Sequence, residues 1–554
     1  MSRQRVARGG SPLSRRDFLK TGAVGGAALA LVLPVAARSG ADADAVASLS
    51  AADSFELEET TVAELQAGMR SGKWSAKELT EKYLERIEKV DRRGAALNSV
   101  IELNPEALAI AESLDRERKA GRTRGPLHGV PVLIKDNIDT ADRMLTTAGS
   151  LALVESRPKQ DAFIVARLRA AGCVIIGKTN LSEWANFRST HSTSGWSARG
   201  GQTRNPYVLD RNPCGSSSGS GAAVAANLAA AAVGTETDGS IVCPASANSL
   251  VGIKPTLGLV SRSGIIPIAH SQDTAGPMAR TVADAAALLG ALAAPDPLDS
   301  VTRESSGRAH ADYTRFLDAS GLRGARLGVA RKHFGFNDRV DKLMSESIDV
   351  LKRLGAVVID PADIPTQGKF DDSELEVLLY EFKADLNKYL AARGPEQRAR
   401  TLKDLIAFNE RNREREMPFF GQELFIRAEA KGPLTSRAYL TALRKNRLLT
   451  RSQGIDAVMR RHRLDAIVAP TGGPPWPTDL VSGDHFTGGY SSASAVAGYP
   501  HVTVPAGYVF GLPVGLSFFG GAWSEPTLIK FAHAFEQATR ARRPPKFTPA
   551  AVLG

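Results

Sequence analysis

The sequence predicts an α/β fold in which a sheet is covered by helices. Short apolar runs suited to buried strands alternate with helical patterns, as in the pair 162–171 and 173–177. The chain has 554 residues and is 43% hydrophobic, so it can bury a large core. No proline-rich or charged linker divides residues 55–550. We therefore expect one large domain with inserted subregions.

The N-terminus carries an export signal. Arg15-Arg16 lies in the sequence SRRDFLK and is followed by an apolar run at 23–37 and small residues at 41–45, where cleavage could occur. A membrane anchor is the alternative, but the run is shorter than the ~20 residues that a spanning helix needs and contains Pro34. Residues 1–45 are therefore predicted to be a twin-arginine signal and its flank, read by the twin-arginine export machinery, with the mature protein periplasmic or secreted.

The charge balance does not indicate a nucleic-acid partner. The net charge is +11, but residues 1–45 contain seven Arg or Lys and three Asp, which leaves about +7 for the rest. The densest basic segment, 393–415, is interleaved with acids and is typical of a solvated helical face.

The cysteines and histidines do not form a metal-binding pattern. Three cysteines are too few for a disulfide framework. Cys214 and Cys243 lie on either side of the alanine-rich run 222–233, and the sequence does not decide whether they form a disulfide bond. The sequence has no CxxC or HExxH, and its nine histidines are scattered. We expect no metal and no organic cofactor.

Two helices are expected near the start of the domain, within 60–92. Thr61 with Glu64, and Ser75 with Glu78, have the spacing of capping boxes. We interpret these helices as packing elements.

Strands and helices then alternate around a lysine. The run 130–134 is predicted to be a buried strand that ends at Lys135. The helix 162–171 and the strand 173–177 follow, and 180–201 is predicted to be polar loop.

In the second half of the chain, strands and helices also alternate, on either side of a helical insertion. Residues 373–462 are mainly helical and charged, and we interpret them as a cap or rim region where substrate choice could reside. The other expected elements are a helix at 281–294, a strand-helix-strand unit at 325–360, and strands at 464–469, 502–504 and 514–518.

The stretch Cys214–Thr256 holds two clusters of serine and glycine, around Ser216 and Ser240. The alanine-rich run 222–233 between them is predicted to be a buried helix, because alanine is the best helix former and packs closely. A flexible Gly/Ser linker is the alternative, but the tract joins directly to this helix rather than to a polar tail.

Two serine mechanisms compete for this stretch. Ser217 is the centre of a G-x-S-x-G sequence, which an α/β-hydrolase would pair with a downstream acid and a histidine such as His501 or His533. Alternatively Ser240 is the nucleophile, in the turn 234–240 whose backbone N–H groups could form an oxyanion hole.

The motifs GVPVLIKDNID, GSSSGSGAAVA, GTETDGSIVCPA and GIKPT, in this order, resemble the amidase signature family over roughly residues 58–540. The resemblance implies the amidase signature fold, a single domain with a central mixed sheet covered by helices. It also implies a Ser-cisSer-Lys triad, with Ser240 as nucleophile, Ser216 as bridging serine after a cis peptide bond, and Lys135 as base. The implied oxyanion hole consists of the N–H groups of Thr237, Asp238, Gly239 and Ser240.

A separate physical argument supports Lys135. A lysine at a strand end is usually a solvated cation, but in a buried pocket lined by serines desolvation lowers its pKa. A neutral amine could then accept a proton near pH 7.

The catalytic turn departs from the family's commoner GTDTGGSIR sequence. Glu236 replaces aspartate, Asp238 replaces glycine and Val242 replaces arginine, so a positive charge beside the site is absent or is supplied elsewhere. With the segment 495–525, this form resembles exported peptide amidases, which remove a C-terminal amide from peptides. The alternative, implied by the same triad, is the amidase-type subunit of a glutamyl-tRNA amidotransferase, which the export signal disfavours.

Overall fold

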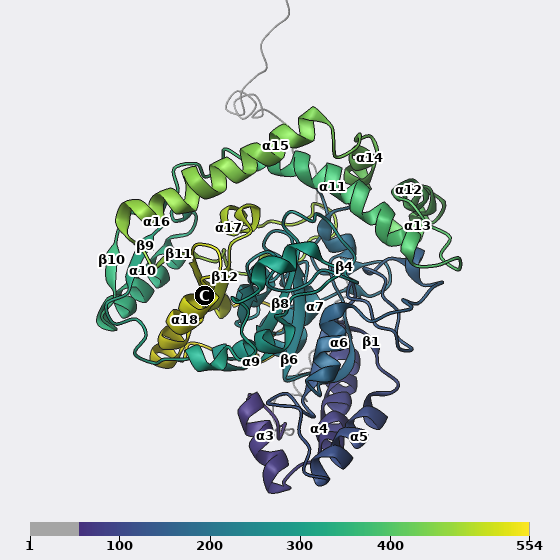
Figure 1. The fold of residues 1–554 in the computed structure, drawn as a ribbon. Helices are drawn as coiled ribbons and strands as arrows, with labels where there is room; N and C mark the ends of the chain where they lie inside the picture. The colour runs from purple at the N-terminus through teal and green to yellow at the C-terminus, as the bar shows by residue number, and fades with distance from the viewer. Residues whose placement is uncertain (1–54, 553–554) are drawn as a thin grey trace, which may run out of the picture. The chain divides into compact units, whose positions relative to one another are not determined.

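The computed structural model describes residues 55–552, which form a mixed sheet with helices on both faces (Figure 1). The predicted signal at 1–45 lies outside the described residues. Across the sheet the strands follow the order β1 (Val100–Leu103), β3 (Val174–Thr179), β2 (Pro131–Lys135), β6 (Ala231–Glu236), β8 (Thr274–Ala279), β7 (Val251–Lys254), β12 (His501–Val509), β13 (Leu512–Phe519), β11 (Ala466–Pro470), β9 (Arg326–Val329) and β10 (Val357–Ile359).

The sheet has two parallel groups of strands separated by an antiparallel middle, and its edge strand β1 pairs antiparallel with β3. Strands β3, β2 and β6 run parallel, as do β11, β9 and β10, whereas every pair from β6 to β11 across the centre is antiparallel. This confirms the predicted central mixed sheet. Since parallel neighbours end at the same edge, β2 and β6 bring the residues that follow them together.

The helices flank the sheet and form the cap region. They are α3 (Val62–Ser71), α4 (Ala76–Arg86), α5 (Ala107–Lys119), α6 (Phe163–Ala170), α7 (Ser218–Ala225), α8 (Val242–Ala247), α9 (Val282–Leu292), α10 (Asp338–Arg353), α11 (Asp371–Ala392), α12 (Leu402–Arg411), α13 (Arg413–Glu416), α14 (Glu423–Glu429), α15 (Arg437–Arg447), α16 (Asp456–His462), α17 (Ser492–Ala497) and α18 (Glu525–Thr539). Within residues 55–552, none is long and apolar enough to cross a membrane.

The capping boxes at the start of the domain are confirmed. Thr61 Oγ1 accepts from the N–H of Glu64 and Ser75 Oγ from that of Glu78, and each glutamate accepts from the backbone of its cap. The residues that these two helices bury include Leu65, Leu79 and other members of the main core. They are packing elements, as expected.

The prediction of one helix over 222–233 is wrong beyond Ala225. Helix α7 ends there, Asn227 takes a left-handed backbone conformation (φ 60°), and the chain enters β6 at Ala231. Strand β6 pairs with β2 on one side and β8 on the other, so its backbone hydrogen bonds are satisfied by the sheet. Tertiary pairing therefore overrides the helical propensity of alanine, a weak preference of a few tenths of a kcal/mol per residue.

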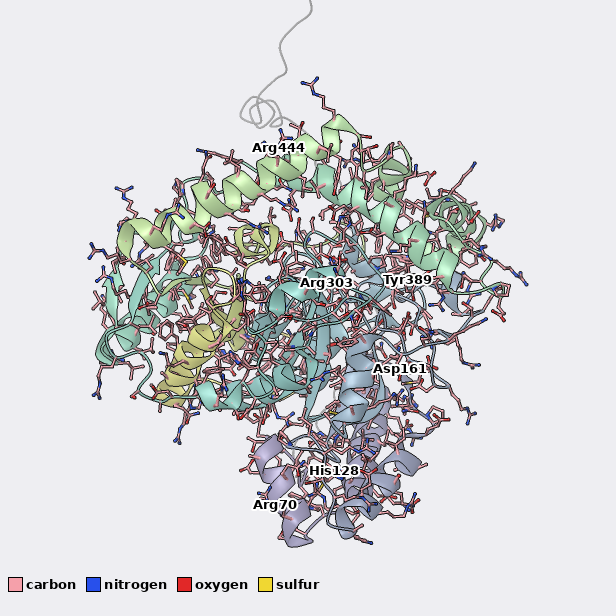
Figure 2. All side chains as sticks on the ribbon, viewed as in Figure 1. Arg70, His128, Asp161, Arg303, Tyr389 and Arg444 are labelled. Carbon is pink, nitrogen blue, oxygen red and sulfur yellow. A yellow bond between two sulfur atoms is a disulfide. The ribbon has the colours of Figure 1, made fainter. Side chains whose placement is uncertain are left out.

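The segment 373–462, interpreted from the sequence as a cap or rim region, is mainly helical. Helix α11 packs against α14 and α15 along one side of the described unit (Figure 1), and a separate apolar cluster underlies α11, α12 and α14. Figure 2 shows Tyr389 on α11 and Arg444 on α15. The Tyr389 hydroxyl donates to Asp139 Oδ1 at 2.7 Å, so α11 is anchored to the loop that follows β2.

Candidate active site

Lys135 is the last residue of β2 and is fully buried. Its Nζ donates to Ser216 Oγ at 2.8 Å, to Thr235 Oγ1 at 2.9 Å and to the Thr235 carbonyl oxygen at 3.2 Å. Thr235 lies on β6, whose register with β2 places it near the same strand end. The structure thus brings two of the sequence-predicted site residues, Lys135 and Ser216, into direct contact.

Burial lowers the pKa of Lys135 from 10.5 to about 7, and the negative charges of Glu236 and Asp273 partly oppose this change. Desolvation favours the neutral amine because an ammonium loses its hydration in the protein interior. An amine with this pKa is present in both forms near neutral pH and can accept a proton.

Ser216 follows a cis peptide bond with Gly215, as the family resemblance implied. The glycines of this loop are required by packing. A Cβ on Gly215 would lie 2.2 Å from Ser182 Oγ, and one on Gly219 would lie 2.3 Å from the Ser99 carbonyl oxygen. The Gly/Ser tract is therefore a closely packed loop and not a flexible linker.

Ser240 lies in the turn that follows β6 and is 9% exposed. Its carbonyl oxygen accepts from the Ser217 N–H at 3.2 Å, which joins this turn to the loop that carries Ser216. Gly239 takes a positive φ of 77°, a conformation that glycine adopts without strain. Glu236 Oε2 accepts from the N–H groups of Ile241 and Val242 at 2.8 and 3.1 Å, which fixes the chain directly after Ser240.

The residue Ser217 has a different environment. Its Oγ donates to the Thr235 carbonyl oxygen at 3.1 Å and accepts from the Thr235 N–H at 3.2 Å.

His501, one of the two histidines considered as its partner, is buried between Ser494 and Ser517. The hydroxyls of these serines contact its two ring nitrogens at 3.0 and 2.6 Å. Burial lowers the pKa of His501 to about 3.

His533 lies on α18 with its Nδ1 3.8 Å from Glu536 Oε2. The Ser217–His pair that an α/β-hydrolase needs is therefore not assembled, because the hydroxyl of Ser217 and the ring of His501 are engaged elsewhere. The G-x-S-x-G sequence here is a packing motif.

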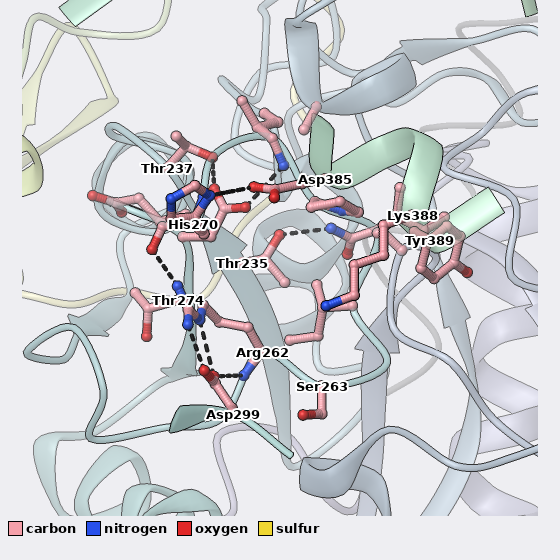
Figure 3. Close-up of a pocket in the computed structure, with 18 of the residues that line it drawn as sticks. Thr235, Thr237, Arg262, Ser263, His270, Thr274, Asp299, Asp385, Lys388 and Tyr389 are labelled. Carbon is pink, nitrogen blue, oxygen red and sulfur yellow. Dashed lines mark hydrogen bonds and ion pairs between the residues drawn. The ribbon is translucent and has the colours of Figure 1, made fainter. Parts of the chain in front are cut away.

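A cavity of about 280 Å³ is lined in part by Ser216 and Thr235, the two residues that Lys135 Nζ contacts. Figure 3 shows the part of this cavity around Thr235 and Thr237. Ser216, Thr235 and Thr237 form part of its lining, and three isoleucines form an apolar wall. Helix α11 contributes Asp385, Lys388 and Tyr389, so the cap region supplies one side of the cavity. The three isoleucines are Ile265, Ile266 and Ile268.

One group of possible metal ligands lies at this cavity, within the part of the chain that the structure describes. It consists of His270, Glu381 and Asp385. Asp385 Oδ2 lies 2.7 Å from His270 Nδ1, and Glu381 accepts from the Tyr439 hydroxyl at 2.7 Å and from the Ser271 N–H at 2.9 Å. These contacts give each side chain a structural partner.

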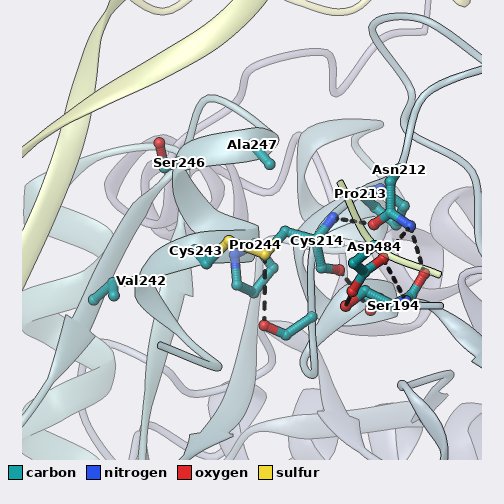
Figure 4. The surroundings of a disulfide bond; sticks show 12 residues. Ser194, Asn212, Pro213, Cys214, Val242, Cys243, Pro244, Ser246, Ala247 and Asp484 are labelled. Carbon is teal, nitrogen blue, oxygen red and sulfur yellow. Dashed lines mark hydrogen bonds between the residues drawn. A yellow bond between two sulfur atoms is a disulfide. The ribbon is translucent and has the colours of Figure 1, made fainter. Parts of the chain in front are cut away.

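The two cysteines left open by the sequence form a disulfide (Figure 4). Cys214 and Cys243 have their Cα atoms 6.0 Å apart. The bond ties the loop that contains Ser216 to α8, which begins directly after the Ser240 turn. Cys173 is a free, buried thiol whose pKa burial raises to about 12.

Sequence reasoning missed the residues that hold the turn from outside. Thr237 Oγ1 donates to Asp273 Oδ1 at 2.6 Å, and its carbonyl oxygen accepts from Gln272 Nε2 at 3.2 Å. Lys254 is buried and interacts electrostatically with Glu236. It supplies a positive charge near a turn in which Val242 replaces the arginine of the commoner family sequence. The motif GIKPT, which contains Lys254, was the feature of the sequence that could have identified this residue.

Comparisons with known proteins identify the family of this chain. A family model for amidases matches residues 78–529. A probable amidase of Arabidopsis thaliana is 46% identical over 504 residues, covering 89% of this chain and 92% of the relative. The chain belongs to the amidase family. This amidase is an enzyme that hydrolyses a carboxamide bond, and its sheet and helices form the amidase signature fold.

Solved structures give the same result at higher identity. Native peptide amidase from Stenotrophomonas maltophilia is 55% identical with a TM-score of 0.85, covering 89% of this amidase and all of that chain. A glutamyl-tRNA(Gln) amidotransferase subunit from Thermotoga maritima is 26% identical with a TM-score of 0.62, covering 86% and 95%. A model of the twin-arginine translocation signal matches residues 12–32, which indicates export across a membrane.

Proposed function

We propose that this amidase removes the C-terminal amide from peptides in the periplasm or outside the cell, after loss of residues 1 to about 45. The hydrogen bond between the buried Lys135 and Ser216, beside an open cavity, carries the assignment of the chemistry. The similarity to solved peptide amidases supports the choice of substrate, and the match to the twin-arginine signal supports the location.

In the proposed reaction Lys135 acts as the base and Ser216 as the relay. Neutral Lys135 accepts the Ser216 Oγ proton while Ser216 accepts the proton of Ser240. The Ser240 oxygen forms a bond to the amide carbon, and the carbonyl oxygen becomes an anion held by N–H groups of the turn, those of Thr237, Asp238, Gly239 and Ser240. The relay then returns a proton to the nitrogen, the C–N bond breaks, and ammonia leaves.

Hydrolysis of the resulting ester completes the cycle. Water gives a proton to the same relay and attacks the acyl carbon, and Ser240 leaves with a proton returned through Ser216. Every proton is carried by Lys135, Ser216 or the reacting groups, so the proposed cycle uses no metal and no organic cofactor.

Variants of two of the serines test the assignment. The mature protein is assayed for ammonia release against peptide amides, aryl amides and aliphatic amides. Ser240→Ala should reduce kcat by at least ~10³-fold because the nucleophile is lost, whereas Ser217→Ala should retain most of the activity. The reverse pattern would replace the proposed triad with an α/β-hydrolase mechanism.

A second candidate function is transfer of ammonia within a glutamyl-tRNA(Gln) amidotransferase, since the homologous chain of that enzyme in Halorhodospira halophila is 36% identical to this amidase. Fractionation of cells separates the two functions. Cleaved protein found outside the cytoplasm supports the peptide amidase, and uncleaved protein that co-purifies with a tRNA-binding partner supports the amidotransferase.

A further inference from the structure

Asp238 ties the catalytic turn to two other parts of the fold. The hydroxyls of Ser491 and Ser492, at the start of α17, donate to its two carboxylate oxygens. Its carboxyl group is also hydrogen-bonded to that of Glu374, which lies in the first turn of α11 and is 8% exposed. In the commoner family sequence this position is glycine, which has no side chain to make these contacts.

Glu374 also reaches the neighbouring residue of the turn. Gln272 Nε2 donates to Glu374 Oε1 at 2.9 Å and to the Thr237 carbonyl oxygen at 3.2 Å. Glu374 therefore contacts Asp238 directly and Thr237 through one amide group. The N–H groups of both turn residues belong to the proposed oxyanion hole.

Two touching, buried carboxyl groups share a proton, because two negative charges at contact distance repel strongly in a medium with little water. Burial raises the pKa of Glu374 well above its usual range, and the charge of Asp238 raises it further. Burial also raises the pKa of Asp238, but the hydroxyls of Ser491 and Ser492 that donate to it and the nearby Lys254 side chain oppose this rise, so Asp238 ionises before Glu374. The neutral Glu374 is thus the hydrogen-bond donor.

The other charged groups around Asp238 and Glu374 also favour the proton on Glu374 and the negative charge on Asp238. Asp371 lies on the same helix as Glu374 and its charge further disfavours ionisation of Glu374. Lys254 on β7 faces Asp238, Glu236 on β6 and Glu525 on α18, so its single positive charge is shared among three acids.

We propose that Glu374 is a positioning residue for amide hydrolysis, whose side chain holds Asp238 directly and Thr237 through Gln272, so that the N–H groups of the turn face the reacting carbonyl oxygen. This inference rests on the proposed function. The Glu374 side chain belongs to helix α11 and holds the turn that contains Ser240, so it links this helix to the turn. When Glu374 ionises as the pH rises, two like charges repel across this contact and the turn loses its anchor.

The variant Glu374→Gln tests the proposal through the pH profile of kcat. Glutamine keeps the size and gives Asp238 a permanent N–H donor. The decrease in kcat that we expect in the wild type as the pH rises should disappear in this variant or move up by more than about one pH unit, the scale at which two carboxyl groups titrate as a pair. Glu374→Ala, which removes the anchor, should lower kcat about tenfold or more with a smaller change in KM.

The matched control is Asp372→Asn, which removes an exposed carboxylate from the same helical turn and should leave kcat and its pH profile unchanged. An unchanged alkaline limb in Glu374→Gln, or full activity in Glu374→Ala, would overturn the proposal. If Glu374→Gln does not fold, Asp238→Asn tests the same pair with the same expected loss of the alkaline limb.

A second measurement needs no substrate. The folded wild type keeps a proton on Glu374 above its ordinary value of 4.5, where the unfolded chain loses it, so wild-type stability falls as the pH rises. Glutamine does not titrate, so the melting temperature of Glu374→Gln minus that of the wild type should increase with pH from about 4.5 upward. A difference in melting temperature that does not change with pH would contradict the inference that Glu374 and Asp238 share a proton. Failure of the wild type to hydrolyse any amide would overturn the proposed function instead and leave this measurement valid.

Discussion

Replacing Lys135 with methionine separates its catalytic role from its structural cost. Methionine is unbranched and apolar, so it can occupy the same narrow space without a proton to exchange. We expect kcat/KM of Lys135→Met to fall by at least ~10²–10⁴-fold, the usual contribution of a general base. The fold should survive, because the buried amine is itself unfavourable to stability.

The magnitude follows from the pKa. A change from 10.5 to about 7 corresponds to about 5 kcal/mol at 1.36 kcal/mol per pH unit, and this is the free energy by which burial disfavours the protonated lysine. Losing the hydrogen bonds to Ser216 and Thr235 offsets about half of that gain, at about 1 kcal/mol each. At pH 7 the free energy of unfolding of Lys135→Met should therefore equal or exceed that of the wild type.

The pH dependence has a definite sign. The folded pKa of Lys135 is lower than the unfolded value, so between pH 7 and 10.5 only the unfolded chain binds this proton. The wild type gains stability as the pH rises through that window. The advantage of Lys135→Met should thus be largest at or below pH 7 and should vanish toward pH 10.5.

Urea unfolding and steady-state kinetics over pH 5–10 check both parts of this prediction. In the wild type the neutral fraction of Lys135 is about one half at pH 7 and about one tenth at pH 6, so kcat/KM should fall about fivefold from pH 7 to 6 and about tenfold per pH unit below that. An acid limb centred near pH 10 would show a solvated lysine and refute the reasoning. So would a Lys135→Met protein that is folded and fully active.

Two further predictions concern neighbouring residues. Ser217→Ala should retain activity but lower the free energy of unfolding by about 1–3 kcal/mol, because the buried Thr235 N–H loses its acceptor; urea titration measures this, and unchanged stability would contradict it. Removing the disulfide with the pair Cys214→Ser and Cys243→Ser should cost about 3–4 kcal/mol, since the bond closes a loop with a sequence separation of 29 residues. Thermal melting with and without reductant checks this, and equal melting temperatures would show that the bond does not form in solution.

The sequence by itself determined the order of most elements and supplied the candidates for the reacting groups. Capping boxes at Thr61 and Ser75 depend on side chains three residues apart, and buried strands such as β2 depend on unbroken apolar runs, so both are visible locally. The resemblance of its motifs to the amidase signature family likewise implied Lys135, Ser216 and Ser240 as the proposed triad.

Only the tertiary structure decided which of two neighbouring serines contacts Lys135 and what fixes the turn that contains Ser240. Ser216 and Ser217 are neighbours in one tract, but Ser217 Oγ is held by both backbone groups of Thr235, and Ser216 Oγ faces Lys135. Tertiary structure also caused the change from helix to strand after Asn227, because the neighbouring strands β2 and β8 supply the hydrogen bonds of β6. Glu374 could not be found from its own segment, since its partners lie over a hundred positions away along the chain. Such contacts arise when distant segments pack together, and a local pattern contains no information about them.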